Sequence, residues 1–208
     1  MVQDWIANRY IKWCGRAFSD DDLIQELSYM APDDDAITDA FEEEIALTAE
    51  GMCGLTGAGT NRMNVYTVGR AAQGLANHLQ ASGRTEEQVL IASGAQAKAE
   101  LFAKTAAAVL ASNGIRVLFY EEAMPVRMFQ KAVSRAKHIG VMITARKEDP
   151  EGYTGFFLFG PDGEKLPEDE ALSVASESES LDYFRDIVFG DFEKLLAEEK
   201  IVSAADPY

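Results

Sequence analysis

The sequence is poor in the side chains that build covalent frameworks and metal sites. Its 208 residues include only two cysteines, Cys14 and Cys53, and two histidines. These are too few for a disulfide framework or a cysteine-built metal site. No apolar run approaches the roughly 20 residues that a bilayer-spanning helix needs, and the N-terminus lacks the basic stretch and apolar run of a secretory signal. We therefore expect a cytoplasmic protein that does not bind membranes.

Basic residues are also scarce outside the centre of the sequence. Residues 20–50 carry 12 acidic and no basic side chains, and residues 162–208 carry 14 acidic and 4 basic ones. Residues 51–161 have a net charge of +4, within a total of −16. This balance argues against nucleic-acid binding. Acidic flanks are typical of solvated helix faces, while the basic centre is compatible with an anionic ligand.

Helical and strand-length patterns alternate through the middle of the chain. Over the whole chain, 47% of the residues are apolar. Apolar residues recur at helical spacing in four stretches, at 36–45, 68–79, 102–110 and 128–136. Short apolar runs of strand length lie at 89–92, 117–120, 141–143 and 156–159. A further helix is expected around Phe192 and Leu195.

The alternation predicts an α/β fold, a three-layer α/β/α domain with helices on both faces of a sheet. No helical pattern separates the last two strand runs, which predicts an antiparallel pair and hence a mixed, mainly parallel sheet. We expect a single domain over residues 1–208. Residues 1–46 would form a helical N-terminal segment, 47–160 the α/β core, and 161–208 a surface excursion followed by a C-terminal helix.

The most distinctive stretch is Gly57-Ala58-Gly59-Thr60-Asn61-Arg62-Met63-Asn64. Glycines separated by one residue allow backbone angles that are closed to other residues. Asn61 and Asn64 can cap the helix expected to begin near Thr67. A helix N-terminus can also bind phosphate, but the lysine of a P-loop is missing. A structural turn before a helix is the favoured interpretation.

That stretch, continued to Val68 and joined by Ala72-Gln73-Gly74-Leu75-Ala76-Asn77, resembles the opening of α-D-phosphohexomutases of the phosphoglucomutase/phosphomannomutase family. The similarity continues through residues 111–115, 141–145 and 153–156, and through Asp191-Phe192 and the helix after it. It covers nearly the whole chain and stops where a second domain of the family would begin. The resemblance implies the first domain, domain I, of an enzyme that moves a phosphoryl group between two positions of a hexose.

For the mechanism, the resemblance implies a phosphoserine, a neighbouring Mg²⁺, basic residues and a distant phosphate clamp, a chemistry that depends on positioning and charge neutralisation. The family's first domain supplies the serine in a loop resembling T-A-S-H-N-P. Here the loop reads Thr144-Ala145-Arg146-Lys147-Glu148-Asp149-Pro150. Arg146 takes the serine position and Lys147 the histidine position. Arginine has no hydroxyl to phosphorylate and stays protonated, and Thr144 is a poor substitute because it lies at a strand end.

Other loops that would face the active cleft also depart from the family. Its G-T-A-G-L-R-G is Thr48-Ala49-Glu50-Gly51-Met52-Cys53-Gly54 here, so Cys53 replaces an arginine. Its D-S-R is Gly94-Ala95-Gln96, and its P-T-P is Pro125-Val126-Arg127. No D-G-D-G-D-R metal loop is present, and Asp162-Gly163-Glu164 is an isolated turn. We therefore expect no catalytic residue, no metal site and no cofactor, with Mg²⁺ needed only in complete family members.

A few side chains keep a weaker functional interpretation. Residual sugar-phosphate binding could come from four basic side chains, those of Arg62, Arg127, Arg146 and Lys147. Glu148 and Asp149 would offset the last two charges locally. His78 and His138 are expected to be structural or surface residues, and Cys53 is a plain small residue unless its pKa is lowered.

Two interpretations stay open for the N-terminus and two for the function. Trp5 and Trp13, with Ile6 and Ile11, fit a helix packed on the body or an exposed apolar face awaiting a partner. The leading functional hypothesis is a catalytically inactive phosphohexomutase-type domain that acts as a binding or interaction module in hexose-phosphate metabolism, in a homodimer or with a partner protein. The alternative is a fragment or subunit of a phosphohexomutase, an intramolecular phosphotransferase, completed by the missing domains.

Overall fold

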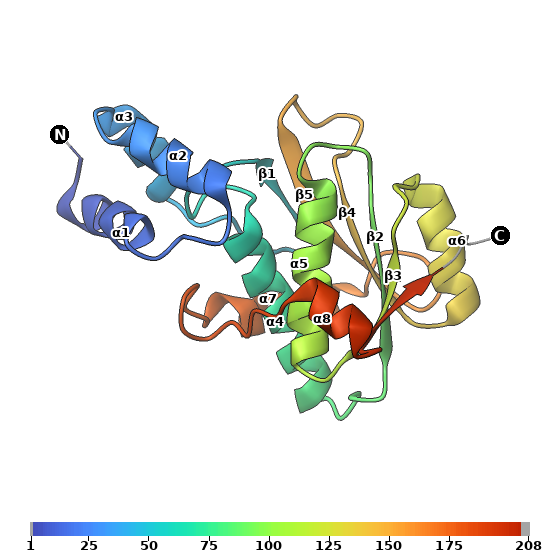
Figure 1. Cartoon of the computed structure of the whole chain (residues 1–208). Helices are drawn as coiled ribbons and strands as arrows, with labels where there is room; N and C mark the ends of the chain where they lie inside the picture. Colours follow the sequence, from blue (N-terminus) through green and yellow to red (C-terminus); the bar gives the residue numbers. More distant parts are fainter. Residues whose placement is uncertain (1, 205–208) are drawn as a thin grey trace.

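A mixed six-stranded sheet forms the centre of the computed structural model, which describes residues 2–204 (Figure 1). The strand order is β1-β5-β4-β2-β3-β6. The strands are β1 (Met52–Leu55), β2 (Gln88–Ser93), β3 (Arg116–Tyr120), β4 (Ile139–Thr144), β5 (Tyr153–Phe159) and β6 (Ile201–Ala204). Strand β2 is parallel to β3 and β4, and β3 is parallel to β6, whereas β5 is antiparallel to β4 and β1. The prediction of a mixed, mainly parallel sheet is confirmed.

Helices cover both faces of this sheet, so the expected three layers are present. They are α1 (Asp4–Cys14), α2 (Asp21–Met30), α3 (Asp34–Phe41), α4 (Val65–Ala81), α5 (Ala99–Ser112), α6 (Val126–Ala136), α7 (Glu168–Glu179) and α8 (Phe192–Ala197). Helices α5 and α8 lie in front of the strands in Figure 1, and α4 packs between α5 and α7. Helix α6 packs on the other face, against β4.

Alternating side chains of the central strands divide between the two cores. Val89 and Ile91 of β2 join the larger cluster under α4 and α5, whereas Leu90 and Ala92 join the smaller cluster under α6. All four are fully buried. Strands buried on both faces read as continuous apolar runs, which is why the sequence locates β2 well but does not say which helix covers which side.

The N-terminal helices α1–α3 form a separate layer beyond the β1 side of the sheet (Figure 1). Trp13 anchors them: its ring meets the rings of Phe41, Tyr66, Tyr183 and Phe184 edge-on, with centroids 5.5 to 5.7 Å apart. Edge-to-face pairs of this kind add to the stabilisation from burial. The helical N-terminal segment expected from the sequence is therefore held firmly on the body.

The N-terminal apolar residues divide between packed and exposed positions, and a partner for the exposed ones stays a prediction. Ile6 and Trp13 are 0% and 2% exposed and pack on the body, whereas Trp5 and Ile11 are 44% and 63% exposed. The four residues belong to one helix, α1, and its period places Ile6 and Trp13 on one face and Trp5 and Ile11 off that face.

The stretch expected to be a surface excursion contains helix α7, and the chain returns afterwards to the sheet as β6. Helix α7 packs on α4 where Gly74 lets the two backbones approach; a Cβ on Gly74 would lie 2.7 Å from the Cβ of Ser178. The expected boundary of the α/β core at residue 160 is therefore too early, because β6 completes the sheet. No helix within residues 2–204 combines the length and apolarity that crossing a bilayer requires.

Candidate functional site

The loops at the carboxyl ends of the parallel strands form the candidate site. Because β2, β3 and β4 run in the same direction, the loops that follow them meet at one edge of the sheet, the usual ligand position in α/β domains. Two hollows lie there. One, of about 460 Å³, is lined by Gly94-Ala95-Gln96, residues 123–126 and Thr144. The other, of about 550 Å³, is lined by residues 149–154 and by Thr56, Gln96, Ala97 and Ala145.

Arg146 and Asp149 close the loop after β4 on itself. The backbone N–H of Arg146 donates to Oδ2 of Asp149 at 2.7 Å, and Nε of Arg146 donates to Oδ1 at 3.1 Å. Nη2 of Arg146 also lies 3.1 Å from Oδ1. The Asp149 side chain is only 5% exposed, whereas that of Arg146 is 44% exposed. The guanidinium is thus folded back onto its own loop and neutralised there.

The same carboxylate binds Cys53 on β1. The thiol of Cys53 donates to Oδ2 of Asp149 at 3.2 Å. Burial, followed by this hydrogen bond and the charge of Asp149, raises the pKa of Cys53 to about 11. Burial alone would raise the pKa of Asp149, but the hydrogen bonds from Arg146 and Cys53 hold it below its ordinary value. Cys53 is therefore a protonated, unreactive thiol at neutral pH, as the sequence suggested.

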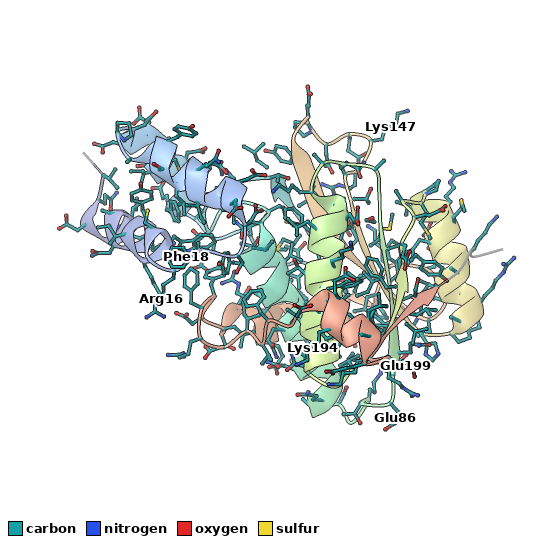
Figure 2. All side chains as sticks on the ribbon, in the orientation of Figure 1. Arg16, Phe18, Glu86, Lys147, Lys194 and Glu199 are labelled. Atoms are coloured by element: carbon teal, nitrogen blue, oxygen red, sulfur yellow. The ribbon has the colours of Figure 1, made fainter. Side chains whose placement is uncertain are left out.

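The four basic side chains considered for phosphate binding come from three segments of the chain, and two of them are engaged in ion pairs. Lys147 is exposed at the outer end of the loop (Figure 2), and Arg127 lies in the first turn of α6. Arg62 is buried and forms an ion pair with Asp39 of α3. The local charge cancellation expected at Arg146 is present, through Asp149 and, at 3.9 Å, a carboxylate oxygen of Glu148.

The glycine-rich turn before α4 is closed by Asn64. Its side chain accepts hydrogen bonds from the N–H groups of Tyr66 and Thr67, both at 3.1 Å, and donates to the carbonyls of Gly57 and Gly59, both at 2.9 Å. The Thr67 hydroxyl accepts in return from the Asn64 N–H at 3.0 Å. Every polar group of the Asn64 amide is thus used within the turn, which favours the structural interpretation over phosphate binding.

Asn61, the other expected cap, instead ties the turn to α3. Its backbone N–H donates to the carbonyl of Ala40 at 3.0 Å, and its amide donates to the carbonyl of Asp39 at 3.3 Å. From α2, Glu26 accepts from the N–H of Ala58 at 2.8 Å. Asn64 alone therefore caps the helix, and the rest of the turn holds the N-terminal segment in place.

The other candidate residues, Thr144 and the two histidines, already have partners within the chain. Thr144 is 6% exposed, and its hydroxyl donates to Oε1 of Gln96 at 3.1 Å. His78 and His138 face Glu170 and Glu87, each with a nitrogen-to-oxygen distance of 3.4 Å.

The acidic side chains do not gather into a metal site. No three His, Cys, Asp or Glu side chains within residues 2–204 are placed to hold a metal ion together. The described residues therefore do not fit the Mg²⁺ that the resemblance implies for complete enzymes.

The central part played by Asp149 was not visible in the sequence. Its spacing from Arg146 indicates a local ion pair, which sequence alone expresses only as charge cancellation. Its contact with Cys53 joins residues 96 positions apart. No local signal marks such a contact, because it depends on β1 lying beside β5 and on the length of the loop.

Comparison with known proteins gives one consistent answer. Residues 44–184 match the family model "Phosphoglucomutase/phosphomannomutase, alpha/beta/alpha domain I". The phosphoglucomutase of Staphylococcus haemolyticus (strain JCSC1435) is 33% identical over 136 residues, covering 65% of this chain and 24% of that protein. The phosphoglucomutase of Staphylococcus aureus (strain USA300) is 30% identical over 165 residues, which cover 79% of this chain and 29% of that protein. The chain thus spans only 24% and 29% of the length of these two relatives.

Solved structures share the fold. A Thermus thermophilus protein assigned as a phosphomannomutase superposes with a TM-score of 0.59 at 21% identity, over 72% of this chain and 31% of that one. A phosphoglucomutase/phosphomannomutase family protein from Burkholderia thailandensis gives 0.53 at 14% identity, over 66% and 30%. The family model begins at residue 44, so helices α1–α3 precede the matched region.

Proposed function

The chain belongs to the phosphoglucomutase/phosphomannomutase family through its α/β/α domain I, and on that premise we propose that it is a non-catalytic form of this domain. It would act as a binding or interaction module in cytoplasmic hexose-phosphate metabolism. The observation that carries the proposal is the Arg146–Asp149 pair in the loop where the family resemblance places the phosphoserine.

The chemistry of the loop supports this proposal in three ways. A phosphoserine mechanism needs a hydroxyl at position 146, and a guanidinium cannot form the ester. Asp149 neutralises Arg146, so the guanidinium is not available to a phosphoryl group without breaking its pair. The hydroxyl of Thr144, two residues earlier, is buried and bound to Gln96. Substitution, charge and burial thus all oppose phosphoryl transfer from this loop.

A weaker capacity for sugar phosphates is left to Lys147 and Arg127. Both belong to segments at the loop edge of the sheet, and a Lys or Arg side chain binds phosphate by charge-assisted hydrogen bonds. The neighbouring carboxylates of Glu148 and Asp149 reduce the local potential, so we propose weak binding at most. A partner protein or a second copy of the chain is the favoured ligand of the module in this proposal.

The alternative is a phosphohexomutase whose remaining domains are supplied by another chain. One observation favours it: the chain spans only 24% and 29% of two phosphoglucomutases that it resembles. In that case the domain would complete a cleft rather than work alone. The substitution at Arg146 weighs against this alternative too, because the other domains of the family do not provide the phosphoserine that the resemblance implies.

A coupled enzyme assay separates these possibilities. The purified chain is incubated with the monophosphates of glucose and mannose, Mg²⁺ and a hexose bisphosphate, with a complete phosphoglucomutase as positive control. We expect no isomerisation above a heat-inactivated sample, for the chain or for Arg146→Ser, because residues that act as a unit are strongly non-additive. Turnover by the chain alone would overturn the proposal. Turnover only after adding the remaining domains of a relative would establish the alternative.

A further inference from the structure

A further pocket, of about 270 Å³, lies between the sheet and α6, on the side of the smaller core. It lies apart from the glycine-rich turn and from α1–α3, but Thr144, Ala145 and Arg146 at the start of the candidate loop also line it. Its apolar lining comes mainly from Val126, Met142, Phe157 and Phe159, and the amide of Gln130 lies at its wall. Two turns, at residues 49–51 and 164–165, form the mouth. The volume is slightly below the roughly 300–1,000 Å³ of pockets that bind drug-sized ligands. The pocket is therefore of a size to hold a small molecule with a single ring.

Two glycines hold the ring of Phe157 in this pocket. A Cβ on Gly155 or on Gly51 would lie 2.6 Å from an atom of that ring, so only glycine leaves it room. Gly51 also has φ of +99°, which other residues rarely adopt. The guanidinium of Arg146 lies over the Phe157 ring at 5.8 Å from its centroid. The ring therefore packs against backbone on one side, with the Arg146 guanidinium above it.

Two carboxylates of the chain itself, Glu50 and Glu164, line the mouth. Glu50, in the turn at 49–51, forms an ion pair with Lys165 from the facing turn. Both side chains are largely exposed, at 67% and 63%. The hydrogen bond and charge of Lys165, aided by the charge of Arg146, lower the pKa of Glu50. The carboxylate thus lies beside Lys165, which favours a negative charge there, and an exposed pair of this kind is held weakly.

From this arrangement we propose that the pocket binds a small, mostly apolar monocarboxylate. The apolar body lies against Phe157 and Met142, and its carboxylate replaces that of Glu50 beside Lys165. Arg146 keeps its pair with Asp149 and contributes only its charge. Nothing in this binding requires phosphoryl transfer, so the inference stands independently of the proposed function.

Phenylacetate, phenylacetamide and acetate are suitable probes, followed by ¹H–¹⁵N chemical-shift titration of the full chain. Phenylacetate should give saturable shifts at Gly51, Leu158 and Lys165. Phenylacetamide should bind more weakly because it lacks the charge, and acetate should give no comparable shifts because it lacks the ring. No saturable shift with phenylacetate, or equal affinity for the acid and the amide, would overturn the proposal.

Charge variants test the mouth. Glu50→Gln removes the competing carboxylate and should tighten phenylacetate binding by about two- to fivefold, the range expected for an exposed ion pair. Lys165→Met should weaken it by a similar factor. Glu86→Gln is the matched control, because Glu86 is also exposed and ion-paired, with Arg116, but lies next to β2 and β3 and does not line the pocket. A Glu50→Gln effect no larger than that of Glu86→Gln would contradict the assigned mouth.

Filling variants test the interior. Val126→Phe, from α6, and Ala49→Phe, from the facing turn, each place a ring in the pocket. Either should abolish the phenylacetate shifts while leaving the thermal melting curve cooperative. The two variants approach from different elements, so loss of folding in one leaves the other to decide. Unchanged phenylacetate affinity in a folded filling variant would overturn the site.

Discussion

The carboxylate of Asp149 accepts hydrogen bonds from both the backbone and the guanidinium of Arg146, at 2.7 and 3.1 Å, three residues earlier in the same loop. The loop is therefore shaped by an internal ion pair at the position where the family resemblance expects a phosphorylated side chain. Because Cys53 donates to the same carboxylate, the state of this pair can be followed through the reactivity of a thiol on a different strand.

Asp149→Asn should make Cys53 more reactive. The substitution removes a negative charge and a strong acceptor, so the pKa of Cys53 should fall from about 11, while burial keeps it above its ordinary value. We expect alkylation by iodoacetamide at mildly alkaline pH to accelerate about three- to tenfold, in proportion to the thiolate fraction. The measurement uses a Cys14→Ser background, because Cys14 is exposed. Glu148→Gln is the control; an equal acceleration there, or none in Asp149→Asn, would contradict the assigned contact.

Glu26 should make stability depend on pH in the opposite sense to a salt-bridged acid. Burial is the largest cause of its raised pKa, and the hydrogen bond from Ala58 only partly offsets it. A carboxyl group whose pKa is higher in the folded than in the unfolded chain stabilises the fold at pH values below its unfolded-state pKa. This stabilisation is lost as the pH rises through its folded-state pKa. Relative to Glu26→Gln, which keeps an acceptor oxygen, the free energy of unfolding should fall as pH rises from about 4 to neutrality.

Urea denaturation of both proteins across this pH range measures the difference. Glu26→Ala provides the contrast, because it leaves the Ala58 N–H without its acceptor and should cost about 1–3 kcal/mol. A pH-independent difference between the native chain and Glu26→Gln would show that the carboxylate is not perturbed by burial.

Asn64→Ala should be one of the more destabilising substitutions on a polar side chain here. It removes an N-cap, worth about 0.5–2 kcal/mol, and leaves the buried carbonyls of Gly57 and Gly59 without their amide donors. We expect a loss of about 2–4 kcal/mol in the free energy of unfolding. Asn64→Asp keeps the cap acceptor but buries a carboxylate oxygen against the carbonyls of Gly57 and Gly59, so it should also destabilise the chain. Equal stability of Asn64→Ala and the native chain, by urea denaturation, would contradict this account of the turn.

The sequence predicted those parts of the fold whose signals are local. The Asn64 cap follows from residue types within one turn, and the sheet follows from apolar runs bounded by helical stripes. Helix α7 was not predicted because its buried face includes Ala171, Val174 and Ala175, small residues dispersed among acidic residues and serines. Strand β6 was not predicted because it has only four residues, and Val202 among them is exposed at the sheet edge.

The candidate site was predicted by position but not by geometry. The sequence placed Arg146 in the loop and indicated that Glu148 and Asp149 offset its charge. It could not show that Asp149 turns inward while Glu148 stays exposed, because that depends on Cys53 arriving from β1. The pocket under α6 was equally hidden, since its lining comes from strands and turns that only the folded chain brings together.

Self-association should strengthen with salt. The net charge of −16 repels a second copy, while exposed apolar side chains such as Ile11 and Phe18, each 63% exposed, favour contact (Figure 2 labels Phe18). Screening shortens the range of the repulsion to about 8 Å at physiological ionic strength. In sedimentation velocity runs we expect a homodimer that tightens from low to physiological salt, burying roughly 800 Å² per subunit. A monomer at high concentration under both conditions would remove the case for a homodimer.

The loop's capacity to carry a phosphoryl group is the most direct test of the central claim. The purified chain is incubated with a hexose bisphosphate and Mg²⁺, beside a complete phosphoglucomutase as positive control, and intact mass and the peptide covering residues 141–155 are measured. The account predicts no phosphate on that peptide in this chain, while the control is phosphorylated. A phosphorylated 141–155 peptide, at Thr144 or at any other residue, would contradict the proposal that this domain I is non-catalytic.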